Sequence, residues 1–191
     1  PRLTAFEVVP GLDAAAVLAA VAAVQSGSEH PLARAVGAAA EAQQLTVLPP
    51  DSVRSVPGRG TEGTVQGAQY LVGSLRWMDE LGVPLGPLAL SVHRHQADGA
   101  TVSLLASRNS ESQPWTALAL LAFGDEPKPG AAQALAALKA RGLRVFMVSG
   151  DNRGAAEAMA RRLGMDVDGG AVIAEVLPGD KAAQVRLLQQ G

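Results

Sequence analysis

The stretch Ser52–Val72, SVRSVPGRGTEGTVQGAQYLV, decides the fold because its glycines fit a pattern that two different folds use. Gly58, Gly60 and Gly63 match G-x-G-x-x-G, the dinucleotide-binding pattern, which needs a helix directly afterwards to receive the pyrophosphate. Here the residues that follow predict further strands, joined by a tight turn at Gly67-Ala68. We therefore expect a β-hairpin. Either the glycines of this loop allow a sharp turn with positive φ, or they let a flat ligand or its phosphates approach the backbone closely.

The segments around this hairpin predict the rest of a first lobe. Before it, Leu12 to Gln44 has the apolar spacing of two amphipathic helices joined by a loop. After it come a short helix between Ser74 and Gly82, a second helix near LALSVHRHQA, and two strands, TVSLLAS and WTALALLAF. Helices followed by successive strands favour an antiparallel sheet with flanking helices on one face, an α+β lobe.

After Gly124 the order of elements changes. A helix, AAQALAALKARG, precedes the buried-type strand LRVFMV, the loop SGDN, another helix, a short strand in AVIAEV and a last helix after LPGDK. This β-α alternation is typical of a parallel sheet with crossover helices, although these strands make a narrow sheet. We expect a first domain at residues 1–122 and a partial α/β domain at residues 123–191, with the joint near Phe123 to Lys128.

Composition excludes several classes of function. The 191 residues carry a formal net charge of -2, without a run of basic side chains, and only 3% are aromatic, so we expect no nucleic-acid partner. The absence of cysteine excludes disulfides and thiolate metal sites. Apolar segments are interrupted well before the roughly 18 residues that span a bilayer, so we expect the chain to work in water.

His30 stands directly before Pro31, which is well placed in the first turn of a helix. The histidine then lies at the helix cap, where the positive helix end disfavours an imidazolium. We expect a neutral ring, suited to stacking on or hydrogen-bonding a heteroaromatic base. The alternative is a plain cap, formed by Ser28 or His30, with no ligand.

The strand end MVSGDN places polar groups where open α/β sheets bind ligands. The Ser149 hydroxyl and the adjacent glycine amide are suited to a phosphoryl oxygen, with Lys181 as a point charge for the same group. Ordinary cap and turn chemistry is the alternative.

His93 and His95 are two residues apart in a predicted helix and face different directions, so we expect solvated surface there and no metal site.

The segments SEHPLARAV, GRGTEGTVQG, LVGS, LKARGLRVFMVSGDN and AEVLPGDKAAQVRLLQ resemble, in order, heavy-metal-transporting P-type ATPases. The resemblance covers essentially the whole chain and is greatest to the copper(I) exporters. It implies a nucleotide-binding domain followed by part of a phosphorylation domain with a haloacid dehalogenase-like fold. ATP is then the bound nucleotide, with Mg2+ required by the intact pump.

The resemblance also implies roles for individual residues, with the histidine matching His30 in contact with adenine. The implied nucleotide-binding set is Gln25, Glu29, His30, Gly58, Arg59, Gly60, Gly73 and Ser74. The implied catalytic set in the other domain is Ser149, Asp151 and Lys181. Gln25 replaces a glutamate that relatives carry near the adenine amino group, and Ser74 replaces an asparagine and is able to cap the next helix. We expect both changes to weaken ATP binding without abolishing it.

The family's phosphorylated aspartate lies in Asp-Lys-Thr-Gly-Thr and its magnesium site in Gly-Asp-Gly, and neither segment occurs in this sequence. The resemblance therefore implies a cytosolic fragment of a membrane-embedded pump, with the remaining phosphorylation, actuator and transmembrane domains as partners. We expect the intact parent to be an ATPase and this fragment not to form the phosphoenzyme. Two alternatives are a haloacid dehalogenase-like phosphatase with a cap domain and a stand-alone nucleotide sensor.

Overall fold

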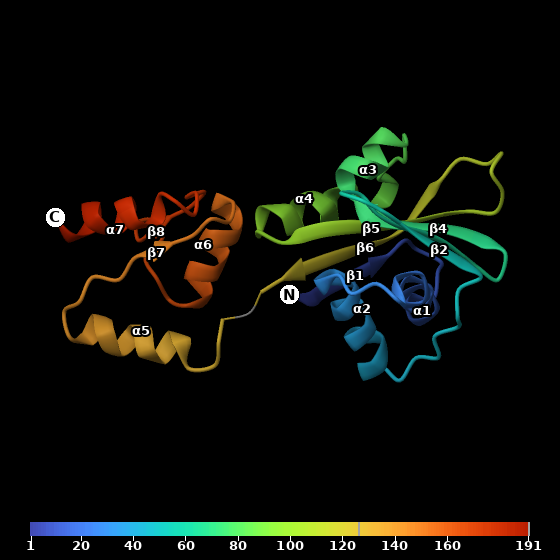
Figure 1. Ribbon diagram of the computed structural model, residues 1–191. Helices are drawn as coiled ribbons and strands as arrows, with labels where there is room; N and C mark the ends of the chain where they lie inside the picture. The colour runs from blue at the N-terminus through green and yellow to red at the C-terminus, as the bar shows by residue number, and fades with distance from the viewer. Residues whose placement is uncertain (126, 191) are drawn as a thin grey trace. The chain divides into compact units, whose positions relative to one another are not determined.

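The computed structural model describes residues 1–125 and 127–190, and these form two compact units (Figure 1). The first unit comprises Pro1–His95 and Thr101–Gly124, and the second comprises Gln96–Ala100 and Asp125–Gly191. Residue 126, inside the expected joint, lies outside the described residues. No helix among the described residues combines the length and the apolar character needed to cross a membrane.

A six-stranded sheet forms the centre of the first unit, and every neighbouring pair of its strands is antiparallel. The strand order is β1-β6-β5-β4-β3-β2. The strands are β1 (Arg2–Val8), β2 (Ser52–Val56), β3 (Gly60–Val65), β4 (Ala68–Ser74), β5 (Thr101–Arg108) and β6 (Thr116–Gly124). The antiparallel sheet expected from the sequence is confirmed, with β1 as an additional edge strand.

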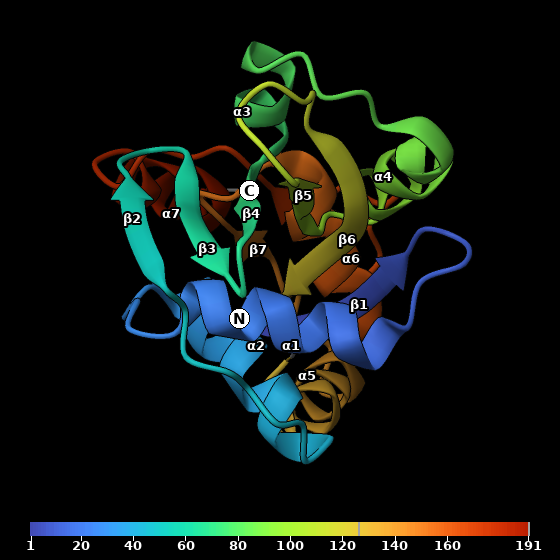
Figure 2. The same cartoon turned by 90° about the vertical axis from the view of Figure 1, so that its right-hand side faces the viewer.

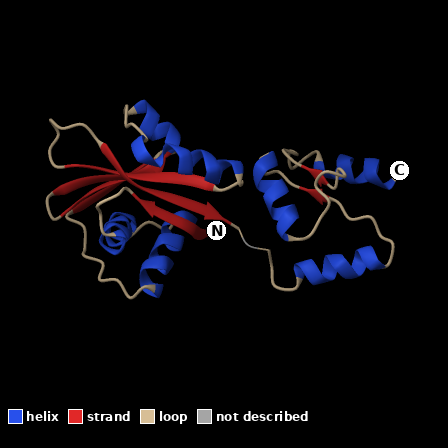
Figure 3. Ribbon diagram, turned by 180° about the vertical axis from the view of Figure 1, so that it is seen from behind, coloured by secondary structure: helices blue, strands red, loops and turns tan. Residues whose placement is uncertain are grey.

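Helices cover both faces of this sheet, so the expectation of cover on one face was wrong. The helices are α1 (Ala14–Gln25) and α2 (Pro31–Ala42) on one side, and α3 (Leu75–Glu80), the 3-10 helix η1 (Gly86–Leu88) and α4 (Ala89–Ala97) on the other (Figures 2 and 3). The central strands explain this arrangement, because residues 102–106 of β5 and 119–123 of β6 are all buried. A continuous apolar strand of this kind needs a packing partner on each face.

The hairpin between β3 and β4 turns one residue earlier than expected. Its turn residues are Gln66 (φ 48°) and Gly67 (φ 80°), and Ala68 already belongs to β4. Two consecutive positive φ angles are typical of the two-residue turns that match the twist of antiparallel strands. The Asp51 carboxylate accepts a hydrogen bond from the Gly67 N–H (3.2 Å), which ties the turn to the start of β2.

The second unit contains a parallel pair of short strands, as the β-α alternation predicted. Its elements are α5 (Ala131–Ala140), β7 (Met147–Val148), α6 (Arg153–Arg162), β8 (Val172–Ile173) and α7 (Lys181–Gln189). The expected six-residue strand LRVFMV is reduced to two residues, because among the described residues only β8 pairs with it. The hydrophobic core of the second unit is small, with Ala156, Ala160, Met165 and Val172 buried together.

Candidate functional site

The end of α1 is joined to the start of β3 by a side-chain hydrogen bond. Gln25 is the last residue of α1, and its Oε1 accepts from the Thr61 hydroxyl at 3.5 Å. Thr61 is a polar residue that is buried in the fold. Because Thr61 directly follows Gly60, the hydrogen bond places the Gln25 amide beside the glycine turn. Thr61 was not predicted from the sequence, because no pattern there marks it.

His30 is the N-cap of α2, with Pro31 in the first turn as expected. Its Nδ1 accepts a hydrogen bond from the Leu32 N–H (3.2 Å). Nδ1 is therefore used by the helix cap, and Nε2 is the ring nitrogen left for another partner. Ser28 instead accepts from the His30 N–H (3.3 Å), which fixes the loop before the helix. His30 and Glu29 are both exposed, so the imidazole edge that carries Nε2 remains accessible while the other edge caps the helix.

The glycine loop is the turn between β2 and β3, which is the hairpin expected from the sequence. A strand rather than a helix follows it, so it is not a dinucleotide fingerprint of the βαβ type. Gly58 has φ 71° with open space around it, and a side chain there meets nothing within 4 Å. Gly60 has φ 154°, and a β carbon there would lie 2.1 Å from the Val72 carbonyl oxygen. Gly60 is thus required by the close approach of two backbones.

Gly73 faces Gly60 across β3 and β4, and it is equally constrained. A β carbon on Gly73 would lie 2.4 Å from the Trp77 ring and 2.5 Å from the Arg59 carbonyl oxygen. Ser74 ends β4, and its hydroxyl caps α3 by accepting from the Trp77 N–H (3.2 Å). The helix-capping role expected for Ser74 is therefore confirmed.

Arg59 is already engaged in an ion pair that the sequence did not reveal. Its Nε lies 2.8 Å from Glu80 Oε2, at the end of α3, and Arg76 Nε lies 3.4 Å from Glu80 Oε1. The hydrogen bond from Arg59 lowers the pKa of Glu80, against a smaller opposing effect of burial. Glu80 is therefore ionised at neutral pH, and one carboxylate is shared by two guanidinium groups.

The polar residues expected in the second unit lie on two loops that are hydrogen-bonded to each other. Ser149 follows β7, and its hydroxyl donates to Asp151 Oδ2 and accepts from the Asp151 N–H, both at 3.1 Å. Its carbonyl accepts from the Val176 N–H (3.0 Å) in the loop after β8. Lys181 is exposed at the first position of α7, farther along that second loop. Ser149 and Asp151 are thus brought together, whereas within the described part of the chain Lys181 forms no hydrogen bond or ion pair with either.

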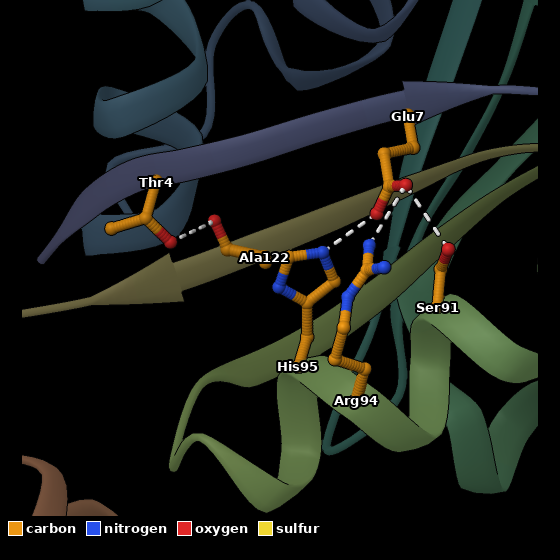
Figure 4. A network of polar contacts seen from close by, with 6 residues as sticks. All are labelled: Thr4, Glu7, Ser91, Arg94, His95 and Ala122. Carbon is orange, nitrogen blue, oxygen red and sulfur yellow. Dashed lines mark hydrogen bonds and ion pairs between the residues drawn. The ribbon is translucent and has the colours of Figure 1, made fainter.

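The expectation of solvated surface was wrong for His95 (Figure 4). His93 is exposed, but His95 is only 18% exposed and its Nε2 lies 2.6 Å from Glu7 Oε2. Ser91 and Arg94 donate to the other oxygen of Glu7, at 3.0 Å and 3.3 Å. Burial raises the pKa of Glu7, but the hydrogen bonds from His95 and Ser91 and the neighbouring charges bring it below 4.5. His95 is largely buried because β1, a strand that was not expected from the sequence, places Glu7 beside the last turn of α4.

A family profile described as haloacid dehalogenase-like hydrolase matches residues 3–191. The chain belongs to the haloacid dehalogenase-like hydrolases. Within these hydrolases, the resemblance to heavy-metal P-type ATPases is confirmed by curated relatives and by solved structures.

Curated relatives of this haloacid dehalogenase-like chain include copper-transporting ATPases. Copper-transporting ATPase 1 of Rhizobium meliloti (strain 1021) is 35% identical over 191 residues, 100% of this chain and 22% of the relative. The copper-exporting P-type ATPase of Staphylococcus aureus (strain JH9) is 35% identical over 172 residues, 89% of this chain and 20% of the relative. The chain therefore spans about a fifth of the length of these relatives, 22% and 20% respectively.

Solved structures give the same family. The crystal structure of a zinc-transporting PIB-type ATPase in the E2.Pi state is 30% identical with a TM-score of 0.85, covering 99% of this chain and 29% of that one. The catalytic domain of the CPx-ATPase CopB-B is 21% identical with a TM-score of 0.64, covering 99% of this chain and 62% of that one. This second likeness shows the fold alone.

Proposed function

We propose that this chain is the ATP-binding region of a heavy-metal-translocating P-type ATPase, with copper(I) as the transported metal. Residues 1–122 would be the nucleotide-binding domain and residues 123–191 part of the phosphorylation domain. The proposal places this region in the cytosol, joined to the remaining phosphorylation, actuator and transmembrane domains of the same pump. The choice of metal rests on the curated relatives, which are named as copper-transporting at 35% identity.

The observation that carries the proposal is the link between Gln25 and the glycine pair. Thr61 binds Gln25 at 3.5 Å and directly follows Gly60, which pairs with Gly73. The end of α1 and the glycine turn therefore meet at the start of β3, and at Gly58 no atom lies within 4 Å of the place where a β carbon would be. A planar base approaching the backbone at Gly58 would meet peptide groups directly, while the exposed His30 ring would offer Nε2, the ring nitrogen that does not cap α2.

In the intact pump, the bound ATP would transfer its γ-phosphoryl group to an aspartate that is not in this sequence. A carboxylate oxygen of that aspartate would attack the γ-phosphorus, the bond from the γ-phosphorus to the bridging oxygen would break, and ADP would leave with the electron pair. Positioning and charge stabilisation are what a protein contributes to such a step. Ser149 and Lys181 would hold the phosphoryl oxygens, and Asp151 would keep the Ser149 hydroxyl oriented.

Magnesium would accompany ATP in the pump and neutralise phosphate charge. Among residues 1–125 and 127–190, no three His, Cys, Asp or Glu side chains are grouped as a metal site requires. The alternative of a phosphatase with a cap domain has less support, because the copper-transporting relatives match the chain over its whole length.

The test is a calorimetric titration of the 191-residue chain with ATP, ADP and GTP, repeated for two histidine variants. His30→Asn keeps a strong N-cap acceptor for α2 and removes only the ring. His93→Asn makes the same change at an exposed position on α4 and serves as the control. Stacking is worth about 1–3 kcal/mol per base, so we expect His30→Asn to weaken ATP binding roughly fivefold or more. If His30→Asn and the wild type bound ATP equally well, the proposed contact between adenine and His30 would be wrong.

A further inference from the structure

We propose that Glu80 is a positioning residue that withholds the Arg59 guanidinium from the nucleotide, and that Arg76 is the partner to which Glu80 turns when a polyphosphate takes Arg59. The inference rests on the proposed nucleotide site. It assigns to Arg59 a contact with the phosphates rather than with the base. It also makes the affinity for ATP depend on two residues of α3 that touch no nucleotide.

The main chain of Arg59 is rigidly placed beside the glycine pair. Its N–H donates to the Val56 carbonyl (3.0 Å), and its carbonyl accepts from the Ser74 N–H (3.0 Å). Gly58 and Gly60, on either side, have φ angles that a larger residue rarely adopts. Arg59 is therefore the charged side chain that the fixed turn between β2 and β3 presents next to the proposed site. Only its long stem is free to move.

The side chain of Arg59 is held in a way that permits exchange. It is 44% exposed in its ion pair with Glu80, so solvent screens the attraction. Exposed pairs of this kind are weak, whereas an anionic phosphate oxygen offers arginine a bidentate, charge-assisted hydrogen bond. A bound polyphosphate can therefore compete with the Glu80 carboxylate for the Arg59 guanidinium and displace it.

Arg76 makes the displacement possible without leaving a carboxylate unpaired. It lies one helical turn before Glu80, its Nε is 3.4 Å from the other carboxylate oxygen, and its side chain is 88% exposed. A side chain so exposed is free to shift fully onto Glu80 once Arg59 leaves. The two arginines therefore act in opposite senses on nucleotide binding. Removing Arg76 leaves Glu80 to hold Arg59 alone.

The experiment measures dissociation constants of ATP, ADP and adenosine by calorimetry for four single variants of the full chain and for two double variants that include Arg59→Gln. Since exposed ion pairs contribute modestly, we expect Glu80→Gln to tighten ATP binding about two- to fivefold, and Arg76→Gln to weaken it by a similar factor. Adenosine should bind all variants equally, and ADP should show a smaller effect than ATP. Glu157→Gln is the matched control, because Glu157 is also shared by two arginines, Arg153 and Arg161, in the second unit.

Arg59→Gln separates this device from a purely structural ion pair. When Arg59→Gln is combined with Glu80→Gln or with Arg76→Gln, the second substitution should no longer change the affinity for ATP, because the guanidinium on which both act is gone. Equal shifts for ATP and adenosine would mean that the pair only braces the turn, and would overturn the inference. So would an unchanged ATP affinity in Glu80→Gln. A wild-type chain that binds no adenosine or ATP would instead refute the proposed function itself.

Discussion

The glycine turn gives a prediction in which two neighbouring positions differ sharply. Gly60→Ala puts a β carbon 2.1 Å from the Val72 oxygen and 2.6 Å from the Gly73 α carbon, against 3.4 Å or more for ordinary contact. Both obstacles are backbone atoms, so β3 and β4 must separate locally. Gly58→Ala meets nothing within 4 Å and is opposed only by its φ of 71°.

The expected costs follow from these geometries. Gly58→Ala should lower the free energy of unfolding by about 1–2 kcal/mol, the price of a left-handed conformation for a residue with a side chain. At Gly60 the strained backbone costs about 1–3 kcal/mol. Each cross-strand hydrogen bond lost there adds about 0.5–1.5 kcal/mol. We expect a total of about 3–5 kcal/mol for Gly60→Ala, in the range reserved for a severe local clash.

Tryptophan fluorescence during urea unfolding is the suitable assay. Both tryptophans, Trp77 and Trp115, belong to the first unit, so the signal reports that unit without interference from the second. Trp77 packs against Gly73 and is close to the perturbation. Equal destabilisation by the two alanine variants would refute the reasoning that backbone contact, rather than turn conformation alone, requires glycine at position 60. A stable Gly58→Ala that loses ATP affinity would show that the open glycine serves the ligand.

Three further predictions concern the ends of α1, α3 and α4. The folded-state pKa of Glu7 lies below 4.5, so the carboxylate stabilises the fold above that pH, and this stabilisation is lost as the pH falls through the lowered value. In Glu7→Gln, the urea midpoint should therefore fall less steeply as the solution is acidified. An unchanged dependence on pH would contradict this. Ser74→Ala removes the cap on the Trp77 N–H and should cost about 1 kcal/mol in the same urea assay, whereas Ser74→Asn should keep the cap. Combining Gln25→Glu with Ser74→Asn should tighten ATP binding several-fold in calorimetry, and no change would count against the proposed site.

The sequence predicted those parts of the fold that depend on local spacing. The hairpins around Ser52–Val72 and the cap at Ser74 were predictable because turn glycines and capping hydroxyls act on their immediate neighbours. Strand β1 was not, since it is defined by pairing with β6, which lies more than 100 residues away in the chain. Its register even shifts between Leu3 and Ala5, so no strict alternation marks it.

The candidate site divides in the same way. His30 at the start of α2 and the glycines of the β2–β3 turn could be found from the sequence, because each stands at the boundary of an element. The Arg59–Glu80 ion pair and the Thr61–Gln25 hydrogen bond could not, because in each case the two partners come from different parts of the chain that only the folded unit brings together. His95 was misassigned for this reason: its environment is set by Glu7 on a strand that the sequence did not reveal.

The geometry at His30 also explains why a chain with three histidines places one directly before a proline. Serine, asparagine and aspartate cap helices well, but they have no ring to stack on a base. Tryptophan and phenylalanine have a ring but no acceptor for the orphan N–H groups at a helix start, and the tyrosine hydroxyl is at the far end of its ring. Histidine alone combines a ring with an acceptor close to its own backbone, and Nδ1 uses that acceptor on the Leu32 N–H. The bond uses Nδ1 and limits rotation of the ring, so under the proposed function the edge that carries Nε2 is the one that would face adenine.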